Sequence, residues 1–231
     1  VLHLNNLCCR LGMDVIEFGS VAALAIDLGT KGILPPEAQE GLELDWGAVA
    51  AVEALAHQVS KAEGLGELFR DGVKPAADRI GEGAAQYTIH IKGMTEPAHS
   101  CPPFVLAFSV ATRGGDHLKG MPLLLLNHPD HELGEKLFQA TKASFDLSSN
   151  EDNGRVVWWH ENYKTSMDAL GTCFFLCASM LPMGHLFPDD LARAFSLATG
   201  IETNADQLMT AGERAYQVEK AFNALRGVDR S

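Results

Sequence analysis

Residues 203–227, TNADQLMTAGERAYQVEKAFNALRG, carry the pattern that decides the fold of this chain. Thr203 and Asp206 have the spacing of a capping box, in which side chains satisfy free backbone N–H groups at a helix start. Gly227 stands where a glycine commonly ends a helix, because it accepts the left-handed backbone conformation. The stretch therefore predicts one long, capped helix.

Helical patterns of the same kind fill most of the chain before this stretch. They predict helices over residues 14–32, 45–64, 65–72, 73–81, 104–112, 132–147, 154–170 and 188–200. The first of these is densely apolar, so we expect it to be buried and to end at Gly29 or Gly32. Asp45 is the expected N-cap of the second.

One stretch is typical of β structure. Residues 87–93, YTIHIKG, alternate in character and are rich in β-branched side chains. The predicted fold class is therefore mainly all-α and multihelical, with at most a few short strands near residues 87–93. A break within residues 94–103, where three prolines fall, divides the chain into expected helical subdomains over residues 1–98 and 99–231.

Composition narrows the classes of function. The net charge of the 231 residues is -12, which disfavours nucleic acid as a partner because phosphate contacts need clustered Lys and Arg. No apolar run is long enough to span a membrane. The five cysteines are odd in number, and Cys8 and Cys9 are adjacent, which does not suit a disulfide framework. Reduced thiols and a cytoplasmic location are expected.

Two short segments combine an acid, a glycine and a cysteine. CRLGMD spans residues 9–14, and DALGTC spans residues 168–173. Their glycines, Gly12 and Gly171, allow a positive φ or a close backbone approach to a ligand. Their acids, Asp14 and Asp168, can accept strong hydrogen bonds from the N–H groups of a heterocycle.

Two cysteines, Cys173 in the second segment and Cys177 after it, can each be interpreted as functional or structural. Cys173 can bind iron or another soft metal as a thiolate. The structural alternative is that each glycine ends a helix and each acid or cysteine caps a helix or fills a gap. Cys177 lies four residues later, within FFLCASML, and there a small buried hydrophobe is favoured.

Histidines and tryptophans supply further candidates. His117 follows two glycines in TRGGDHL, and it either transfers protons at a site or meets solvent in a loop. His128 and His131 flank Pro129 and predict a surface turn, with a metal pair as the alternative. Trp158 and Trp159 are expected to anchor packing.

Five stretches together resemble the C-terminal part of the tungsten-containing aldehyde:ferredoxin oxidoreductases. The matching stretches are LNNLCCRLGMDVIEFGSVAALAIDLGTKGIL (4–34), IKGMTEPAHS (91–100), LAFSVATRGGDHLKG (106–120), DALGTC (168–173) and TGIETNADQLMTAGERAYQVEKAFNALRG (199–227). They come in the family's order and cover nearly the whole chain. GER and KAFNALRG in the last stretch are the most specific.

The resemblance implies a fold and a set of cofactors. Enzymes of this family hold tungsten, or in some relatives molybdenum, between two pyranopterins beside a [4Fe-4S] cluster. A β-rich N-terminal domain cradles the pterins, and two helical domains close over them. This chain resembles those two helical domains, domains 2 and 3, and lacks the pterin-cradling domain.

The resemblance also implies roles for individual residues. The family's pterin pattern is Asp-x-x-Gly-Leu followed by Asp or Cys. On that pattern Asp168 and Gly171 contact one pterin, and Cys173 is a ligand of the cluster. Gly12 and Asp14 contact the other pterin, and His117 is the catalytic histidine near the metal.

The chain departs from the family pattern at three places. Cys9 stands where the first Asp is expected, and Thr172 stands where Leu is expected. AHSCPP, residues 98–103, replaces an Asp-Pro-Arg turn that many members carry. The first departure exchanges a charged acceptor for a thiol beside the first pterin.

The implied activity is the oxidation of an aldehyde-type substrate to a carboxylic acid, with electrons passed through the cluster to ferredoxin or a similar carrier. The family's other three cluster cysteines lie upstream of the matching part. We therefore expect these 231 residues to be the C-terminal portion of a longer enzyme and to bind neither cofactor alone. A homo-oligomer is a further option. The alternative function is a non-catalytic helical domain that serves in binding or subunit assembly.

Overall fold

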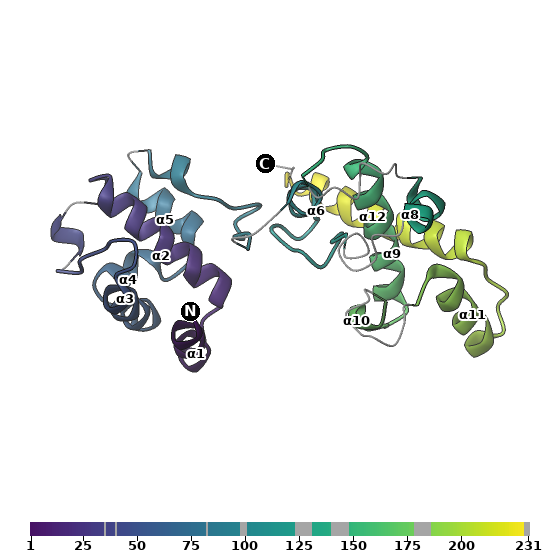
Figure 1. Ribbon diagram of the computed structural model, residues 1–231, viewed down its shortest axis with the longest axis horizontal. Helices are drawn as coiled ribbons and strands as arrows, with labels where there is room; N and C mark the ends of the chain where they lie inside the picture. Colours follow the sequence, from purple (N-terminus) through teal and green to yellow (C-terminus); the bar gives the residue numbers. More distant parts are fainter. Residues whose placement is uncertain are drawn as a thin grey trace. The chain divides into compact units, whose positions relative to one another are not determined.

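The computed structural model describes residues 1–34, 36–39, 41–81, 83–97, 101–122, 131–139, 148–177 and 186–228, with the side chains of residues 36, 131 and 177 left aside. These residues belong to two compact units, Val1–Pro97 and Ala98–Ser231. Both units are built from helices (Figure 1). The described residues contain no strand, which confirms the predicted all-α class.

The elements of the first unit are α1 (Leu2–Leu11), α2 (Val15–Thr30), η1 (Pro36–Gln39), α3 (Val49–Lys61), α4 (Leu65–Phe69), α5 (Val73–Ile80) and η2 (Ala84–Tyr87). In this unit, α1, α3, α5 and η2 all contact one apolar helix, α2. Phe18, Val21 and Leu28 of α2 are buried in its core. The prediction of a buried helix is therefore confirmed. The helix ends before Gly32, which has φ 69°, while Gly29 lies inside the last turn.

The expected cap of α3 is wrong. The helix begins at Val49, after the N-cap Ala48, whose side chain makes no capping hydrogen bond. Asp45 instead accepts a hydrogen bond from the backbone N–H of Trp46 at 2.7 Å. Its carboxylate therefore organises the turn before the helix, because a short acidic side chain readily bonds to nearby backbone groups.

The expected strand at residues 87–93 is also absent. Tyr87 closes the 3₁₀ helix η2, and the segment after it forms one isolated antiparallel bridge, between Ile91 and Met94. Lys92 and Gly93 both have positive φ, so the chain reverses between the two bridge residues. An alternating pattern becomes a strand only when a neighbouring strand takes up its backbone hydrogen bonds, and this tight reversal supplies a single rung.

The second unit is organised around α9. Its helices are α6 (Pro102–Val110), α8 (His131–Phe138), α9 (Asn153–Ala169), α10 (Phe174–Cys177), α11 (Pro188–Thr199) and α12 (Ala205–Leu225). Helices α6, α8, α10 and α12 all contact α9. Figure 1 shows α12 beside α9. The predicted helix over 132–147 is described only as α8, and residues 140–147 lie outside the described part.

Helix α9 is buried on all sides over residues 159–167. Trp159 packs with Phe138 and Tyr163, whereas Trp158 is 48% exposed, so only one of the two tryptophans anchors packing as expected. The polar members of the buried stretch bond largely within the unit. Ser166 Oγ, for example, lies 2.9 Å from the backbone oxygen of Asn162 and 3.0 Å from that of Leu208 in α12.

The long C-terminal helix starts one residue later than expected. Asn204 is the N-cap, and it exchanges side chain–backbone hydrogen bonds with Gln207 at 2.9 and 3.0 Å. Thr203 is engaged elsewhere, because its N–H donates to Ser196 Oγ of α11 at 2.9 Å. Gly227, with φ 72°, follows the end of the helix as predicted. Within the described part of the chain, no helix is both long and apolar enough to cross a membrane.

Buried His160 makes the stability of the second unit depend on pH. Burial lowers the pKa of its imidazole from 6.5 to about 4, although Nδ1 bonds to the Val156 oxygen at 2.7 Å. The unfolded chain therefore binds this proton at a higher pH than the folded chain. The contribution of neutral His160 is complete above pH 6.5 and is lost as the pH falls towards 4. The expected loss is about 3 kcal/mol.

The test compares the wild type with His160→Phe, which cannot titrate and retains an aromatic ring beside Phe138 and Trp159. Urea unfolding is measured between pH 7 and 4 for both proteins. Carboxylates contribute equally to both, so the difference between the two curves reports His160. We expect the free energy of unfolding of the wild type to fall relative to that of His160→Phe as the pH falls. A difference that stays constant with pH would contradict the lowered pKa of His160.

Candidate functional site

The segment Asp168–Cys173 forms the turn between α9 and α10. Asp168 lies in the last turn of α9, and Gly171 follows with φ 69°, a conformation that L residues rarely adopt. The N–H of Thr172 donates to the backbone oxygen of Met167 at 2.9 Å, which closes the helix. Nothing lies within 4 Å of a Cβ built on Gly171, so the turn is open on that side. The structural role expected for this glycine is therefore observed.

The Asp168 carboxylate is held by two buried lysines. Lys164, one turn earlier on α9, donates to Oδ1, and Lys119 Nζ lies 3.9 Å from Oδ2. The side chains of Lys164 and Lys119 are 9% and 5% exposed, while that of Asp168 is 43% exposed. The carboxylate is thus fixed from inside the unit and is still accessible to a hydrogen-bond donor from outside.

Cys173 ends this turn. It is exposed and has a free thiol, and it stands between the open turn at Gly171 and the start of α10. Its thiol is therefore accessible from outside the unit. The side chain of Cys177 lies outside the described part, so its expected burial stays a prediction.

The first segment, Cys9–Asp14, links α1 to α2. Gly12 ends α1 with φ 73°, and Asp14 is the N-cap of α2, accepting from the N–H of Glu17 at 2.7 Å. Gly12 therefore ends a helix and Asp14 caps one, which is the structural alternative stated from the sequence. Asp14 is exposed, as is Cys9, whereas burial raises the pKa of the neighbouring Cys8 thiol.

His117 lies in a loop between α6 and the rest of the second unit. Its ring makes an edge contact with Phe108, with centroids 6.3 Å apart, and it is partly buried. Asp116 pairs with Arg113 and accepts from the N–H of Leu118 at 2.7 Å, which shapes the loop. The histidine is thus neither a free solvent-facing side chain nor a core residue.

The structure brings this loop to the Asp168 segment through Lys119. Lys119 is two residues after His117, and its ammonium lies between Asp168 and Glu219, which it reaches at 2.6 Å. Sequence reasoning missed Lys119, Lys164 and Glu219. The i, i+4 spacing of Lys164 and Asp168 on a predicted helix was a usable signal. Glu219 had none, because its partners are about a hundred residues away.

A hollow of about 490 Å³ opens beside this arrangement. It lies between α12 and the loop, and its lining combines charged and apolar side chains: Thr112, Arg113, Lys119, Val218, Glu219, Phe222 and Asn223. Lys119 lines the hollow and also lies 3.9 Å from Asp168, so the hollow and the Asp168 segment share this one side chain.

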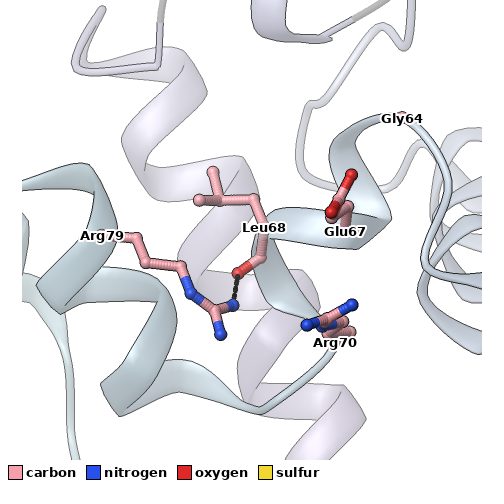
Figure 2. A pocket seen from close by; sticks show the side chains of 5 residues that line it. All are labelled: Gly64, Glu67, Leu68, Arg70 and Arg79. Carbon is pink, nitrogen blue, oxygen red and sulfur yellow. Dashed lines mark hydrogen bonds between the residues drawn. The ribbon is translucent and has the colours of Figure 1, made fainter.

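A second hollow, of about 360 Å³, lies in the first unit around α4 and α5 (Figure 2). Figure 2 shows Arg79 donating to the backbone oxygen of Leu68, at 3.0 Å, with Arg70 nearby. Both arginines also pair with Asp71, and the hydrogen bond from Arg79 lowers the pKa of that carboxyl. Both arginines are thus paired within the first unit, and we assign no functional role to this hollow.

Among the described residues, no group of three or more His, Cys, Asp and Glu side chains could hold a metal ion. The expected turn at His128 and His131 lies outside the described residues, apart from the backbone of His131.

The helices of both units and the two Leu-Gly turns define a multihelical protein whose turns present an acid or a thiol at the surface. Comparison with known families gives the assignment. The family model described as "Aldehyde ferredoxin oxidoreductase, domains 2 & 3" matches residues 1–231, and the chain belongs to this family. The resemblance stated from sequence is confirmed.

Individual relatives agree. The tungsten-containing aldehyde ferredoxin oxidoreductase of Pyrococcus furiosus is 23% identical over 99% of this chain and 36% of its own length. The aliphatic sulfonate oxidoreductase, WOR-like subunit, of the same organism is 32% identical over 51% of this chain and 20% of its own length. The chain thus spans about a third or less of the relatives it matches.

A solved structure shows the same fold. The active-site complex BamBC of benzoyl coenzyme A reductase, solved with 1,5-dienoyl-CoA, matches 94% of this chain and 37% of that chain, with a TM-score of 0.69 and 22% identity. This likeness supports the helical fold and, at that identity, nothing about substrate.

Proposed function

We propose that this chain forms the helical domains of a tungsten- or molybdenum-pterin oxidoreductase that oxidises an aldehyde-type substrate to a carboxylic acid. Electrons pass through a [4Fe-4S] cluster to ferredoxin or a similar carrier. The observation that carries the proposal is the Asp168–Cys173 turn, which offers a fixed carboxylate and a free thiol at one surface. The family membership of the whole chain supports it.

The residues present fit parts of the two cofactors. Asp168 would accept hydrogen bonds from one pterin, with the open turn at Gly171 allowing close approach. Cys173 would bind the cluster through its thiolate. In the first unit, Asp14 retains carboxylate capacity beyond its single capping bond, and it would serve the other pterin together with the backbone at Gly12.

When bound, the metal centre supplies the two-electron chemistry that protein side chains lack. His117 would accept or donate the accompanying proton at an imidazole nitrogen, as histidine can near neutral pH. The Phe108 contact and the turn at Asp116 would hold its ring in place. We propose that the two units correspond to domains 2 and 3 of the family.

Cys9 departs from the family pattern, and this departure favours the alternative function, a non-catalytic helical domain. Cys9 is exposed at the position where the family pattern has an acid, so the first pterin contact loses a charged acceptor. A helical domain that serves in binding or assembly would tolerate this change. The two functions differ in whether the complete protein carries out redox chemistry.

The experiment that separates them measures aldehyde-dependent electron transfer by the complete protein. The protein that contains these 231 residues is purified without oxygen and mixed with a panel of aliphatic and aromatic aldehydes. We expect reduction of ferredoxin or of a viologen dye with matching release of carboxylic acid. His117→Gln should lower the rate, with retained cofactors as the control. No turnover with any aldehyde would favour the alternative.

A further inference from the structure

Glu219 of α12 joins the two ends of the loop that carries His117. One carboxylate oxygen, Oε2, accepts from the hydroxyl of Thr112 at 2.6 Å, and the other, Oε1, accepts from Lys119 Nζ at 2.6 Å. Thr112 and Lys119 bracket the loop, five residues before His117 and two after it. A single carboxylate thus closes the base of the loop.

The contact is supported by the next turn of the same helix. Asn223 donates from its side-chain amide to the backbone oxygen of Thr112 at 2.7 Å. The side chain of Lys119 is 5% exposed and that of Glu219 is 37% exposed, so their charge-assisted hydrogen bond is buried on the lysine side and open to water on the carboxylate side. The loop is therefore fixed at its first end by two residues of α12 and at its last end by one.

Lys119 carries this arrangement on to the Asp168 segment. Its Nζ lies 3.9 Å from Asp168 Oδ2 while it is held by Glu219. A shift of Glu219 would therefore move both Lys119 and the loop with His117 relative to Asp168. Catalytic geometry is sensitive to displacements of about 1 Å.

We propose that Glu219 is a positioning residue, which clamps the ends of the Thr112–Lys119 loop and so sets the place of His117 relative to Asp168. The inference rests on the proposed function in one respect, namely that His117 and Asp168 serve the same reaction. The clamp itself is a property of the folded chain and can be measured without turnover.

The test uses Glu219→Ala in the complete protein. Alanine has no side-chain acceptor, so neither Thr112 nor Lys119 can bond to it, whereas a glutamine could keep both bonds because the Thr112 hydroxyl also accepts. Glu213→Ala, on the same helix and outside the clamp, is the matched control. Thr112→Val removes one arm of the clamp without changing charge.

Two measurements are made on each variant. Hydrogen–deuterium exchange of residues 113–118 measures whether the loop is held, and we expect Glu219→Ala to lose protection there while Glu213→Ala keeps it. The rate of aldehyde oxidation measures the consequence for the reaction, and we expect kcat of Glu219→Ala to fall about 10- to 100-fold with KM and cluster signal unchanged. Thr112→Val should have a smaller effect that is not additive with Glu219→Ala.

The outcomes separate the claims. Unchanged exchange in Glu219→Ala would overturn the clamp. Lost protection with an unchanged kcat would overturn the positioning role. A fall in kcat matched by Glu213→Ala, or accompanied by loss of the cluster signal, would show a general structural effect and overturn the positioning role as well. Wild-type protein that oxidises no aldehyde would remove the proposed function and the positioning role together, while exchange would still decide the clamp.

Discussion

Cys173→Ser in the complete protein is expected to abolish the electron paramagnetic resonance signal of the reduced [4Fe-4S] cluster or to change its form. Serine replaces a soft, ionisable ligand by a hard hydroxyl that is poorly ionised near neutral pH. The exposed, free thiol at the end of the Asp168–Cys173 turn is the observation behind the prediction. The measurement is the signal per protein after dithionite reduction, together with iron and sulfide content.

Cys177→Ser is the matched control, one turn further along. Its neighbours in sequence are apolar, so we expect it to pack and not to bind iron. Its cost should be the burial of a hydroxyl, about 1–3 kcal/mol of stability, with the cluster signal intact. The ligand assignment would be wrong if Cys173→Ser kept an unchanged signal, or if Cys177→Ser lost it.

Gly212→Ala is expected to cause the largest loss of stability in the second unit. A Cβ at Gly212 would lie 2.2 Å from Ser166 Oγ and 2.3 Å from the backbone oxygen of Asn162, both on α9. Backbone atoms cannot yield, so α12 must move away from α9. The expected cost is about 3 kcal/mol, at the upper end of overpacking. Urea unfolding followed by tryptophan fluorescence measures it.

Gly154→Ala is the control, because Gly154 lies in the first turn of α9 with nothing within 4 Å of a built Cβ. It should be neutral or slightly stabilising, since alanine favours the helix more than glycine does. Displacement of α12 should also weaken the hydrogen bond of Tyr216 to Glu161, which is 2.6 Å long and buried. Equal stability of Gly212→Ala and the wild type would show that the two helices are not in tight contact there.

The fold class was predictable from sequence because helix signals are local. The apolar period of α2, the proline at the start of α11 and Gly227 after α12 each act within a few residues of the helix that they begin or end. Residues 87–93 misled for the opposite reason, since a strand depends on a partner that a local pattern cannot show. The N-caps predicted at Asp45 and Thr203 were wrong by one turn or less, because several nearby polar side chains compete for the same backbone groups.

The site was only partly predictable. The turns at Gly12 and Gly171 could be read from the acid, glycine and cysteine close together in each segment. The cations and the carboxylate around Asp168 could not all be read in this way. Lys119 and Glu219 are joined by tertiary packing of α12 on the His117 loop, across a separation that leaves no periodic trace in the sequence.

We propose that this chain belongs to a working metal–pterin and iron–sulfur enzyme, and metal analysis is the most direct test. The complete protein is purified without oxygen, and its tungsten, molybdenum and iron are quantified by mass spectrometry per polypeptide. We predict one tungsten or molybdenum atom and a four-iron cluster per chain, with a lower iron content in Cys173→Ser. Stoichiometric protein that contains neither tungsten nor molybdenum, and no cluster iron, would contradict it.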